Sequence, residues 1–286
     1  MAVIGHRGPS PGSPAQAPAR PANRDRIRVV PGAPGIERME AHLHGKAFSP
    51  HRHDTYAIGI TLSGVQTFRF RGAQWHCLPG QCHVLHPDEL HDGGAGTDDG
   101  FGYRIVYVDP ALVQDALGGS SLPFVADPVL DGMPLENRLA AIWDIDADID
   151  DVARVELVLA VADLLTGSAR SPSLPIGPLA LHGLARARDF IVADIGMRAS
   201  MAELEGIAGL DRWTLARQFR AAFGTSPSRF RLLRQLDEVR RLVTDGTTLA
   251  QAAAEAGFAD QSHMSRHFKR AYGLTPARWA AALAAG

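Results

Sequence analysis

The spacing of apolar and polar positions changes along the chain and divides it into regions. Between about residues 36 and 109, short runs rich in β-branched and aromatic residues are interrupted by Gly and Pro. Runs of this kind predict the strands of a small β-barrel or sandwich. The predicted strands include residues 56–62, 67–70, 82–85 and 103–108.

After Pro110 the apolar spacing becomes helical, and residues 135–165 are rich in Ala, Leu and Val. Residues 167–178 then have the composition of a linker. At the other end of the chain, residues 1–34 are Pro-rich with few large apolar residues, and we expect them to be disordered. One apolar stripe of the helical region fits either a core face or a homodimer seam, and it consists of Val155, Val158, Leu159, Ala162 and Leu165.

From residue 179 to the end the pattern is helical throughout, and the sequence repeats itself. Six positions recur at one constant interval, which indicates a duplicated helical unit. They are Arg217, Phe219, Phe223, Gly224, Pro227 and Phe230, which recur as Arg266, Phe268, Tyr272, Gly273, Pro276 and Trp279.

Each unit has the order of a helix-turn-helix: a capped short helix, a Gly turn, a second helix capped by Asp, and a Ser-Pro or Thr-Pro restart. The residues that give this order are Ser200, Glu203, Gly209, Asp211, Ser226 and Pro227 in the first unit and Thr248, Gln251, Gly257, Asp260, Thr275 and Pro276 in the second.

Charge is unevenly distributed, although the formal net charge is only −2. Residues 179–286 contain 15 Lys and Arg against 10 Asp and Glu, so this region is basic and the rest of the chain is acidic. Such a balance is typical of a polyanion-binding module attached to another domain. A solvated basic face is the alternative for one helix alone, but two equivalent basic helices favour DNA.

The second helix of each unit can enter a major groove, where its arginine would read guanine edges and its basic end would meet phosphates. Its apolar face, Leu215, Phe219 and Ala222 or Met264, Phe268 and Ala271, is expected to be buried. The predicted DNA-binding residues are Arg212, Trp213, Arg217, Arg220, Gln261, Ser262, Ser265, Arg266, Lys269 and Arg270.

Residues 183–283 resemble the DNA-binding domain of the AraC/XylS family of bacterial transcription regulators. The strongest match is residues 253–270, continuing through Pro276. The resemblance implies a long helix over residues 228–243 that sets the two recognition helices into successive segments of the major groove. It also implies base contacts from Trp213 and Arg217 in the first unit and from Gln261, Ser262, Ser265 and Arg266 in the second.

One residue departs from the family pattern. Glu205 stands where the family usually has a small Ala packed under the recognition helix, whereas the second unit keeps Ala253. We expect Glu205 to loosen the first unit or to turn outward, so base contacts from the second unit are the firmer expectation.

The N-terminal region resembles the cupin-like sensor domain of many family members, from residues 48–53 through Leu78-Pro79-Gly80 to residues 87–91. The implied fold class is an α+β multidomain protein: an N-terminal cupin-like β-barrel with trailing helices, then an all-α domain of two helix-turn-helix units. The expected domains are a disordered N-terminus (1–34), a sensing and dimerisation domain (35–166), a linker (167–178) and the DNA-binding domain (179–286).

Seven of the twelve histidines lie between residues 44 and 91. His51 and His53 are two apart on a predicted strand, so they project to one face, and His91 comes from another strand. Three histidines can hold a metal, but residues 54–59 lack the Glu that the metal-binding cupin pattern places there. We therefore expect no metal and no other cofactor, and we assign His51, His53, Tyr56 and His91 to an effector pocket. Structural histidines, or a metal-dependent cupin fused to a DNA-binding domain, are the alternatives.

The sequence thus predicts a DNA-binding transcription regulator controlled by a small-molecule effector in the barrel, with no catalytic residues and no enzyme activity. The expected partners are double-stranded promoter DNA, the effector, a second copy in a homodimer and RNA polymerase, but no membrane. Only two cysteines, Cys77 and Cys82, and the absence of a signal-like or spanning apolar run favour the cytoplasm. The effector, the operator sequence and the direction of regulation do not follow from the sequence.

Overall fold

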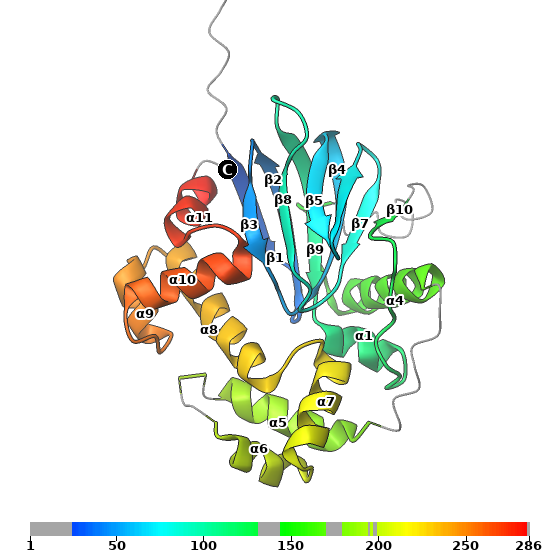
Figure 1. Ribbon diagram of the computed structural model, residues 1–286, viewed down its shortest axis with the longest axis vertical. Helices are drawn as coiled ribbons and strands as arrows, with labels where there is room; N and C mark the ends of the chain where they lie inside the picture. The colour runs from blue at the N-terminus through cyan, green and yellow to red at the C-terminus, as the bar shows by residue number, and fades with distance from the viewer. Residues whose placement is uncertain (1–24, 131–143, 170–178, 194, 197–198, 285–286) are drawn as a thin grey trace, which may run out of the picture.

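The chain folds into a β-sheet domain followed by a helical domain, and the two domains are in contact (Figure 1). The predicted fold class is confirmed. The computed structural model describes residues 25–130, 144–169, 179–193, 195–196 and 199–284.

The described strands form two antiparallel sheets. The six-stranded sheet has the order β1-β2-β9-β4-β7-β10, and the four-stranded sheet has the order β3-β8-β5-β6. The bounds are Arg26–Pro31 (β1), Ile36–Leu43 (β2), Phe48–His51 (β3), Tyr56–Gly64 (β4), Gln66–Phe70 (β5), Ala73–Cys77 (β6), Cys82–Leu85 (β7), His91–Ala95 (β8), Phe101–Val108 (β9) and Val129–Leu130 (β10).

The apolar runs of the sequence account for the strands. In β5 the rings of Phe68 and Phe70 are buried while Arg69 between them is exposed, because successive side chains of a strand point to opposite faces. The four predicted strands are confirmed as β4, β5, β7 and β9, with small differences at their ends.

The expectation of disorder over residues 1–34 is wrong for its last part. Strand β1 pairs antiparallel with β2, and Ile27 is only 1% exposed. Ile27 and Val29 alternate with Arg26 and Arg28, which is the pattern of a strand with one apolar face. The surrounding Pro and Gly residues conceal this short pattern. Residues 1–24 lie outside the described residues.

Helices α1 (Pro110–Ala116) and α4 (Asp151–Ser168) pack on the six-stranded sheet and share a hydrophobic cluster with it. The first two residues of the expected linker belong to α4, and its residues 170–178 lie outside the described part of the chain. The same holds for residues 135–143 of the predicted helical region.

The apolar stripe predicted on α4 is only partly right. Val158, Ala162 and Leu165 are buried, whereas Val155 is 55% and Leu159 is 48% exposed. Val155 and Leu159 are four residues apart and lie together at one edge of the stripe, which is exposed, while the other three members face the core.

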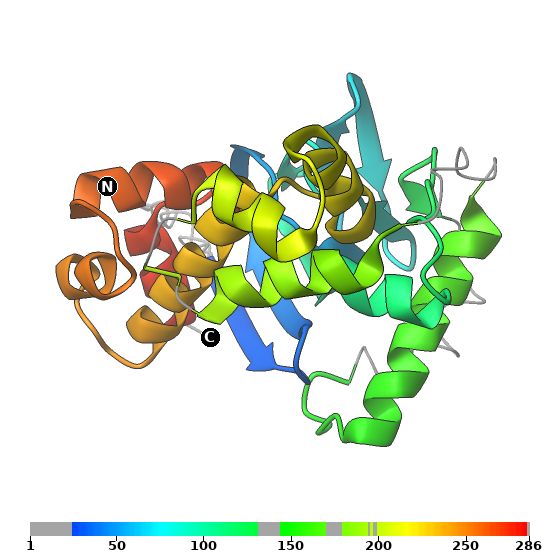
Figure 2. The same ribbon diagram turned by 90° about the horizontal axis from the view of Figure 1, so that it is seen from below.

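The helical domain contains the two predicted helix-turn-helix units, α6–α7 and α9–α10, joined by the long helix α8. In Figure 2, α9, α10 and α11 lie on one side of the molecule and α4 on the opposite side. No helix among the described residues is long and apolar enough to cross a membrane. The bounds are Leu181–Ala193 (α5), Met201–Ala208 (α6), Arg212–Phe223 (α7), Pro227–Thr244 (α8), Leu249–Glu255 (α9), Gln261–Tyr272 (α10) and Pro276–Leu283 (α11).

The predicted caps are present, which explains why these helices begin and end where they do. Ser200 and Glu203 form a complete capping box, and Thr248 accepts a hydrogen bond from the backbone N–H of Gln251. The remaining N-caps are Asp211, Ser226, Asp260 and Thr275, and Gly209, Gly224 and Gly273 end their helices in the left-handed conformation.

One hydrophobic cluster belongs to both domains. Ile27, Leu43 and Phe101 of the sheets are in the same cluster as Leu236 and Phe268 of the helices. A second cluster lies between the six-stranded sheet and α4, and a third fills the first helix-turn-helix unit. The β-sheet domain and the helical domain therefore share part of their hydrophobic core.

Candidate functional site

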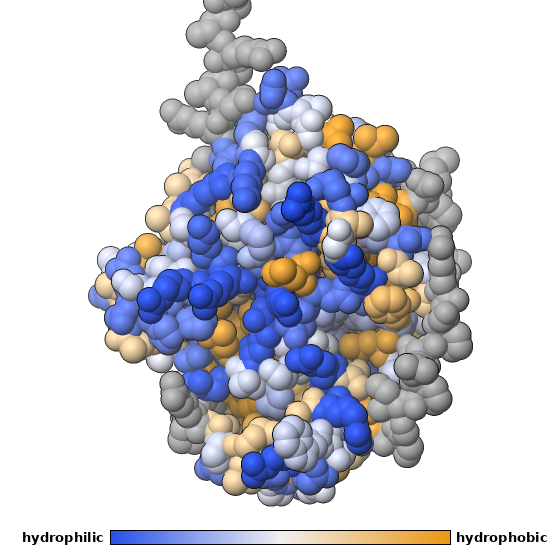
Figure 3. Space-filling view, viewed as in Figure 1, coloured by the Kyte–Doolittle hydropathy of each residue, from blue (hydrophilic) through white to orange (hydrophobic). Residues whose placement is uncertain are grey.

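The two recognition helices, α7 and α10, bury the apolar faces that the sequence predicts and expose basic ones. Trp213 at the start of α7 is 79% exposed. The surface over α10 is mainly hydrophilic (Figure 3). All the predicted DNA-binding residues are exposed except Ser265, which is half-buried; the exposed ones are Arg212, Trp213, Arg217, Arg220, Gln261, Ser262, Arg266, Lys269 and Arg270.

The side chain of Glu205 is 24% exposed and reaches the start of α7. Its Oε1 accepts a hydrogen bond of 2.6 Å from the backbone N–H of Arg212, the first residue of α7. The Arg212 Nε lies 3.4 Å from the same oxygen. A carboxylate at a helix N-terminus satisfies free N–H groups and is favoured by the helix dipole. Glu205 therefore supports the start of the recognition helix, whereas Ala253 in the second unit is only 1% exposed.

The C-terminus of each recognition helix lies against the sensor domain. At the end of α7, Gly224 leaves no room for a Cβ beside Pro87. At the end of α10, Gly273 leaves no room beside Ser49 and His51. Backbone N–H groups near β3 also donate to α10: Ser49 to the Gly273 carbonyl at 2.9 Å and Arg52 to the Arg270 carbonyl at 3.3 Å.

A cavity of about 750 Å³ lies between the sheets and the helical domain. Apolar side chains of the sheets, such as Met39 and Phe68, face Leu233 of α8 and Trp279 of α11 across it. Both domains contribute to its wall, so an occupant would contact both at once. A cavity of this size is typical of small-molecule sites.

The predicted histidine cluster lies at this cavity. The rings of His51 and His91 are 4.2 Å apart between centroids, and those of His53 and His91 are 4.7 Å apart. Each Nδ1 donates to a backbone carbonyl: His51 to Ser49 at 2.9 Å, His53 to Thr55 at 2.8 Å and His91 to Glu89 at 2.9 Å. Since the carbonyls only accept, these bonds fix the proton on Nδ1 and leave Nε2 as an acceptor.

Burial keeps these imidazoles neutral. It lowers the pKa values of His51 and His53 well below the ordinary value of 6.5, and it lowers the pKa of His91 to about 4. The neighbouring imidazoles add to the effect for His51 and His53. At neutral pH the cluster is a set of uncharged hydrogen-bonding groups.

His83 on β7 is a fourth cavity histidine, which the sequence pattern does not single out. It is fully buried, and neither of its ring nitrogens has a hydrogen-bond partner. Burial lowers its pKa to about 3. Buried polar atoms without partners are rare in proteins, and at a cavity wall they fit a ligand that supplies the missing bond. Because β7 is buried along its whole length, its pattern gave no signal for which side chains face the cavity.

Among the residues that the structure describes, no group of three or more His, Cys, Asp or Glu is placed to hold a metal ion. One expectation for this region changes. Tyr56 does not line the cavity. It packs in the cluster beneath α4, and its hydroxyl donates to the Pro123 carbonyl at 3.2 Å. Tyr103 and Tyr107 of β9 line the cavity instead.

Ion pairs join the two domains at the cavity wall. Arg234 of α8 lies 2.8 Å from the carboxylate of Asp54, and Arg240 lies 2.7 Å from that of Glu37. Burial raises the pKa of Asp54 to about 6, although Arg234 opposes the shift. Such buried pairs fix geometry more than they add stability.

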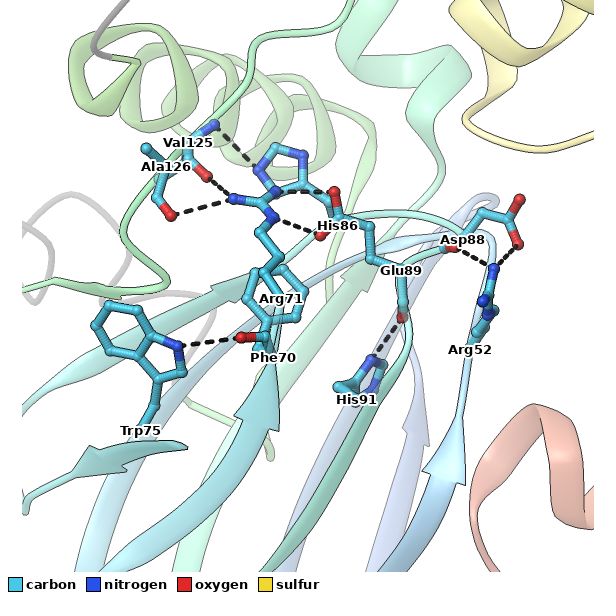
Figure 4. A network of polar contacts seen from close by, with 10 residues as sticks. All are labelled: Arg52, Phe70, Arg71, Trp75, His86, Asp88, Glu89, His91, Val125 and Ala126. Carbon is cyan, nitrogen blue, oxygen red and sulfur yellow. Dashed lines mark hydrogen bonds and ion pairs between the residues drawn. The ribbon is translucent and has the colours of Figure 1, made fainter. Parts of the chain in front are cut away.

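The loop between β7 and β8 contacts both the histidine cluster and the first helix-turn-helix unit. Figure 4 shows two of its residues, Asp88 with Arg52, and Glu89 with His91 and Arg71. The Glu89 carbonyl accepts from His91, and the Glu89 carboxylate is bound by Arg71 at 2.6 and 2.9 Å. The carboxylate of the preceding residue, Asp88, faces three arginines of which two belong to the helical domain: Arg52, Arg220 and Arg229.

The fold and these two sites define a transcription regulator with an effector-binding domain and a helix-turn-helix DNA-binding domain. Residues 33–160 match the model of an AraC-like ligand binding domain, and residues 204–282 match that of a helix-turn-helix domain. Together the two matches span most of the chain, so it pairs an AraC-like ligand binding domain with a helix-turn-helix domain, the combination that the sequence resemblance implies.

Known transcriptional regulators match this chain over most of its length. The chain is 23% identical over 242 residues to the HTH-type transcriptional regulator YbfI of Bacillus subtilis, covering 79% of this chain and 88% of that protein. It is 25% identical over 251 residues to the transcriptional activator RhaS of Yersinia pestis, covering 83% and 91%. A structure of ToxT from Vibrio cholerae with a bound unsaturated fatty acid superimposes with a TM-score of 0.62 at 14% identity, covering 93% and 99%. The last likeness establishes the fold.

Proposed function

We propose that a small molecule bound in the cavity between the two domains controls how the regulator engages promoter DNA. The observation that carries this proposal is the composition of the cavity wall, which comes from the sheets and from α8 and α11 together. A ligand bound there changes the relative energies of arrangements of the two domains, and it does so by its difference in affinity for them.

The side chains of the cavity wall also indicate the chemical class of the effector. Most of the wall is apolar, with side chains such as Met39, Phe68 and Leu233, while His51, His53, His83 and His91 gather at one part. We therefore propose an effector with an apolar body and an uncharged hydrogen-bonding group that meets the neutral imidazoles. The fatty acid of ToxT is a property of that protein; in this cavity the wall arginines Arg234 and Arg240 are already paired with Asp54 and Glu37.

DNA recognition is proposed to use α7 and α10 in successive segments of the major groove. Arg266 is the leading base-reading residue, and Lys269 is a phosphate contact. The two helices have the caps and the buried faces of recognition helices, which supports this assignment. The finer partners are proposals too: RNA polymerase at the promoter, and a homodimer supported by the exposed Val152, Val155 and Leu159 of α4. A cytoplasmic protein without enzyme activity fits the same function.

The test combines DNA selection with ligand screening. The full chain is first used to enrich duplexes from a random library, and its affinity for the enriched duplex is compared with that for random DNA. Small molecules that raise the melting temperature of the wild type are then added to the DNA-binding assay. The proposal predicts sequence preference, and a change in DNA affinity that is weakened in a His91→Ala variant. Equal affinity for enriched and random DNA, or ligands that stabilise the protein without changing DNA affinity, would contradict it.

A further inference from the structure

Asp88 has a backbone conformation that few residues other than glycine adopt. Its φ is 59°, and only Arg71 shares a positive φ among the non-glycine residues that the structure describes. The backbone N–H of Asp88 donates to the His53 carbonyl at 2.7 Å, and its side chain is 11% exposed. Asp and Asn tolerate the left-handed region better than other side chains do. The hydrogen bond to His53 stabilises this conformation, in which the carboxylate of Asp88 lies against the helical domain.

One carboxylate thereby meets the arginines at the junction of the first helix-turn-helix unit. Oδ1 lies 2.9 Å from Nε of Arg229, and Oδ2 lies 3.4 Å from Nη2 of Arg220. Arg229 in turn donates to the Arg52 carbonyl at 2.8 Å. Arg220 is on α7, the first recognition helix, and its side chain is 62% exposed. A DNA phosphate that binds Arg220 must therefore compete with Asp88.

The same loop touches the cavity cluster at two points. Asp88 is bonded through its N–H to the carbonyl of His53, and the next carbonyl, that of Glu89, accepts from Nδ1 of His91. Pro87 packs against Gly224, the C-cap of α7. Three consecutive residues thus connect two cavity histidines with the C-terminus and one arginine of the recognition helix.

We propose that Asp88 restrains the first helix-turn-helix unit by holding Arg220 away from DNA, and that occupancy of the cavity beside His53 and His91 changes this restraint. The inference rests on the proposed function, because it takes the cavity as the effector site. Asp88 acts through Arg220 and is a positioning residue rather than a DNA contact. A ligand that moves either histidine moves the loop and weakens or strengthens the pairing.

The test is the Asp88→Asn variant, which keeps a side chain suited to the left-handed conformation and removes the charge. Glu89→Gln is the matched control, since it removes the same charge one residue away, where the carboxylate pairs with Arg71 inside the sensor. Affinity for the enriched duplex is measured over a range of salt concentrations. Freeing Arg220 for one more phosphate makes the slope of log K against log salt steeper by about 0.9. Asp88→Asn should show this change and Glu89→Gln should not.

Two further experiments test whether the effect of Asp88 depends on Arg220 and on His91, rather than on the overall charge of the protein. In an Arg220→Ala background, Asp88→Asn should leave the slope unchanged. His91→Ala, or His91→Asn if the alanine variant does not fold, should raise affinity and be non-additive with Asp88→Asn. Equal slopes for Asp88→Asn and Glu89→Gln, persistence of the effect without Arg220, or full additivity with His91 would each overturn the inference. A wild type that enriches no preferred duplex would instead overturn the proposed function.

Discussion

The Oε1 atom of Glu205 accepts a hydrogen bond of 2.6 Å from the backbone N–H of Arg212, so the residue that departs from the family pattern supports the start of α7 beside the N-cap Asp211. We predict that Glu205→Ala lowers the free energy of unfolding by about 1 kcal/mol, the typical cost of losing a helix cap. Urea denaturation of the full chain measures the change. A Glu205→Ala variant more stable than the wild type would mean that the Glu strains the unit.

The equivalent position of the second unit provides the control. Ala253 is 1% exposed and packs in the shared hydrophobic cluster. We expect Ala253→Glu to cost about 3 kcal/mol or more, because it buries a carboxylate without a partner. A small loss there would show that the second unit can also place a carboxylate at the start of its second helix.

Arg266 and Lys269 on α10 should respond differently to truncation. Arg266→Ala is expected to weaken binding to the enriched duplex by about 1–3 kcal/mol and to random DNA much less, since a bidentate guanine contact is lost. Lys269→Ala should weaken binding to both and reduce the salt dependence. Fluorescence anisotropy with both duplexes measures the two effects. Equal losses of Arg266→Ala on both duplexes would remove its base-reading role.

How much of this could be read from the sequence depends on how local each feature is. The repeat, the caps and the buried faces of α7 and α10 follow from residues close in sequence, and they were predicted. The far wall of the cavity was not, because Leu233 and Trp279 reach it only after the two domains pack together. Strand β4 is buried on both faces from Tyr56 to Thr61, so alternation could not tell which face Tyr56 occupies.

The histidine cluster predicts an acid-sensitive fold. The unfolded chain binds protons on these histidines as the pH falls below about 6.5, whereas folded His91 binds one only near pH 4 and His83 near pH 3. Since the unfolded state then binds more protons, acid favours it. The free energy of unfolding should fall by up to about 1.4 kcal/mol per pH unit for each histidine between pH 6.5 and 4.

Asp54 works in the opposite direction, because its folded pKa of about 6 lies above its ordinary value of 3.8. Protonation between these two values favours the folded state and partly offsets the histidines. Urea denaturation at a series of pH values measures the net slope. His91→Gln should reduce the slope of unfolding free energy against pH by the contribution of about one proton, and Asp54→Asn should increase the slope. An unfolding free energy that stays constant between pH 6.5 and 4 would show that the buried histidines are not kept neutral.

Gly273 offers a test of the contact between α10 and the sensor. Gly209 and Gly273 both end helices at positive φ, 68° and 71°, but a Cβ at Gly209 meets nothing, whereas one at Gly273 meets Ser49 and His51. Gly209→Ala should cost about 1 kcal/mol through backbone strain alone. Gly273→Ala should cost more and speed hydrogen exchange at the Ser49 and Arg52 amides, which donate to α10. Equal losses of unfolding free energy for the two variants, with unchanged hydrogen exchange at these amides, would show that the contact between α10 and β3 adjusts to the added methyl group without cost.

The hydrophobic cluster shared by the sheets and the helical domain has a consequence for how the molecule melts. Ile27 and Phe101 of the sensor lose packing when Phe268 of the second helix-turn-helix unit leaves, and the reverse is also true. Heat should therefore unfold both domains in one calorimetric transition rather than two. Complete separation of the helical domain would expose the shared apolar side chains and destabilise the β-sheet domain. The size of any domain movement is therefore limited by how much of this shared core can be exposed to solvent.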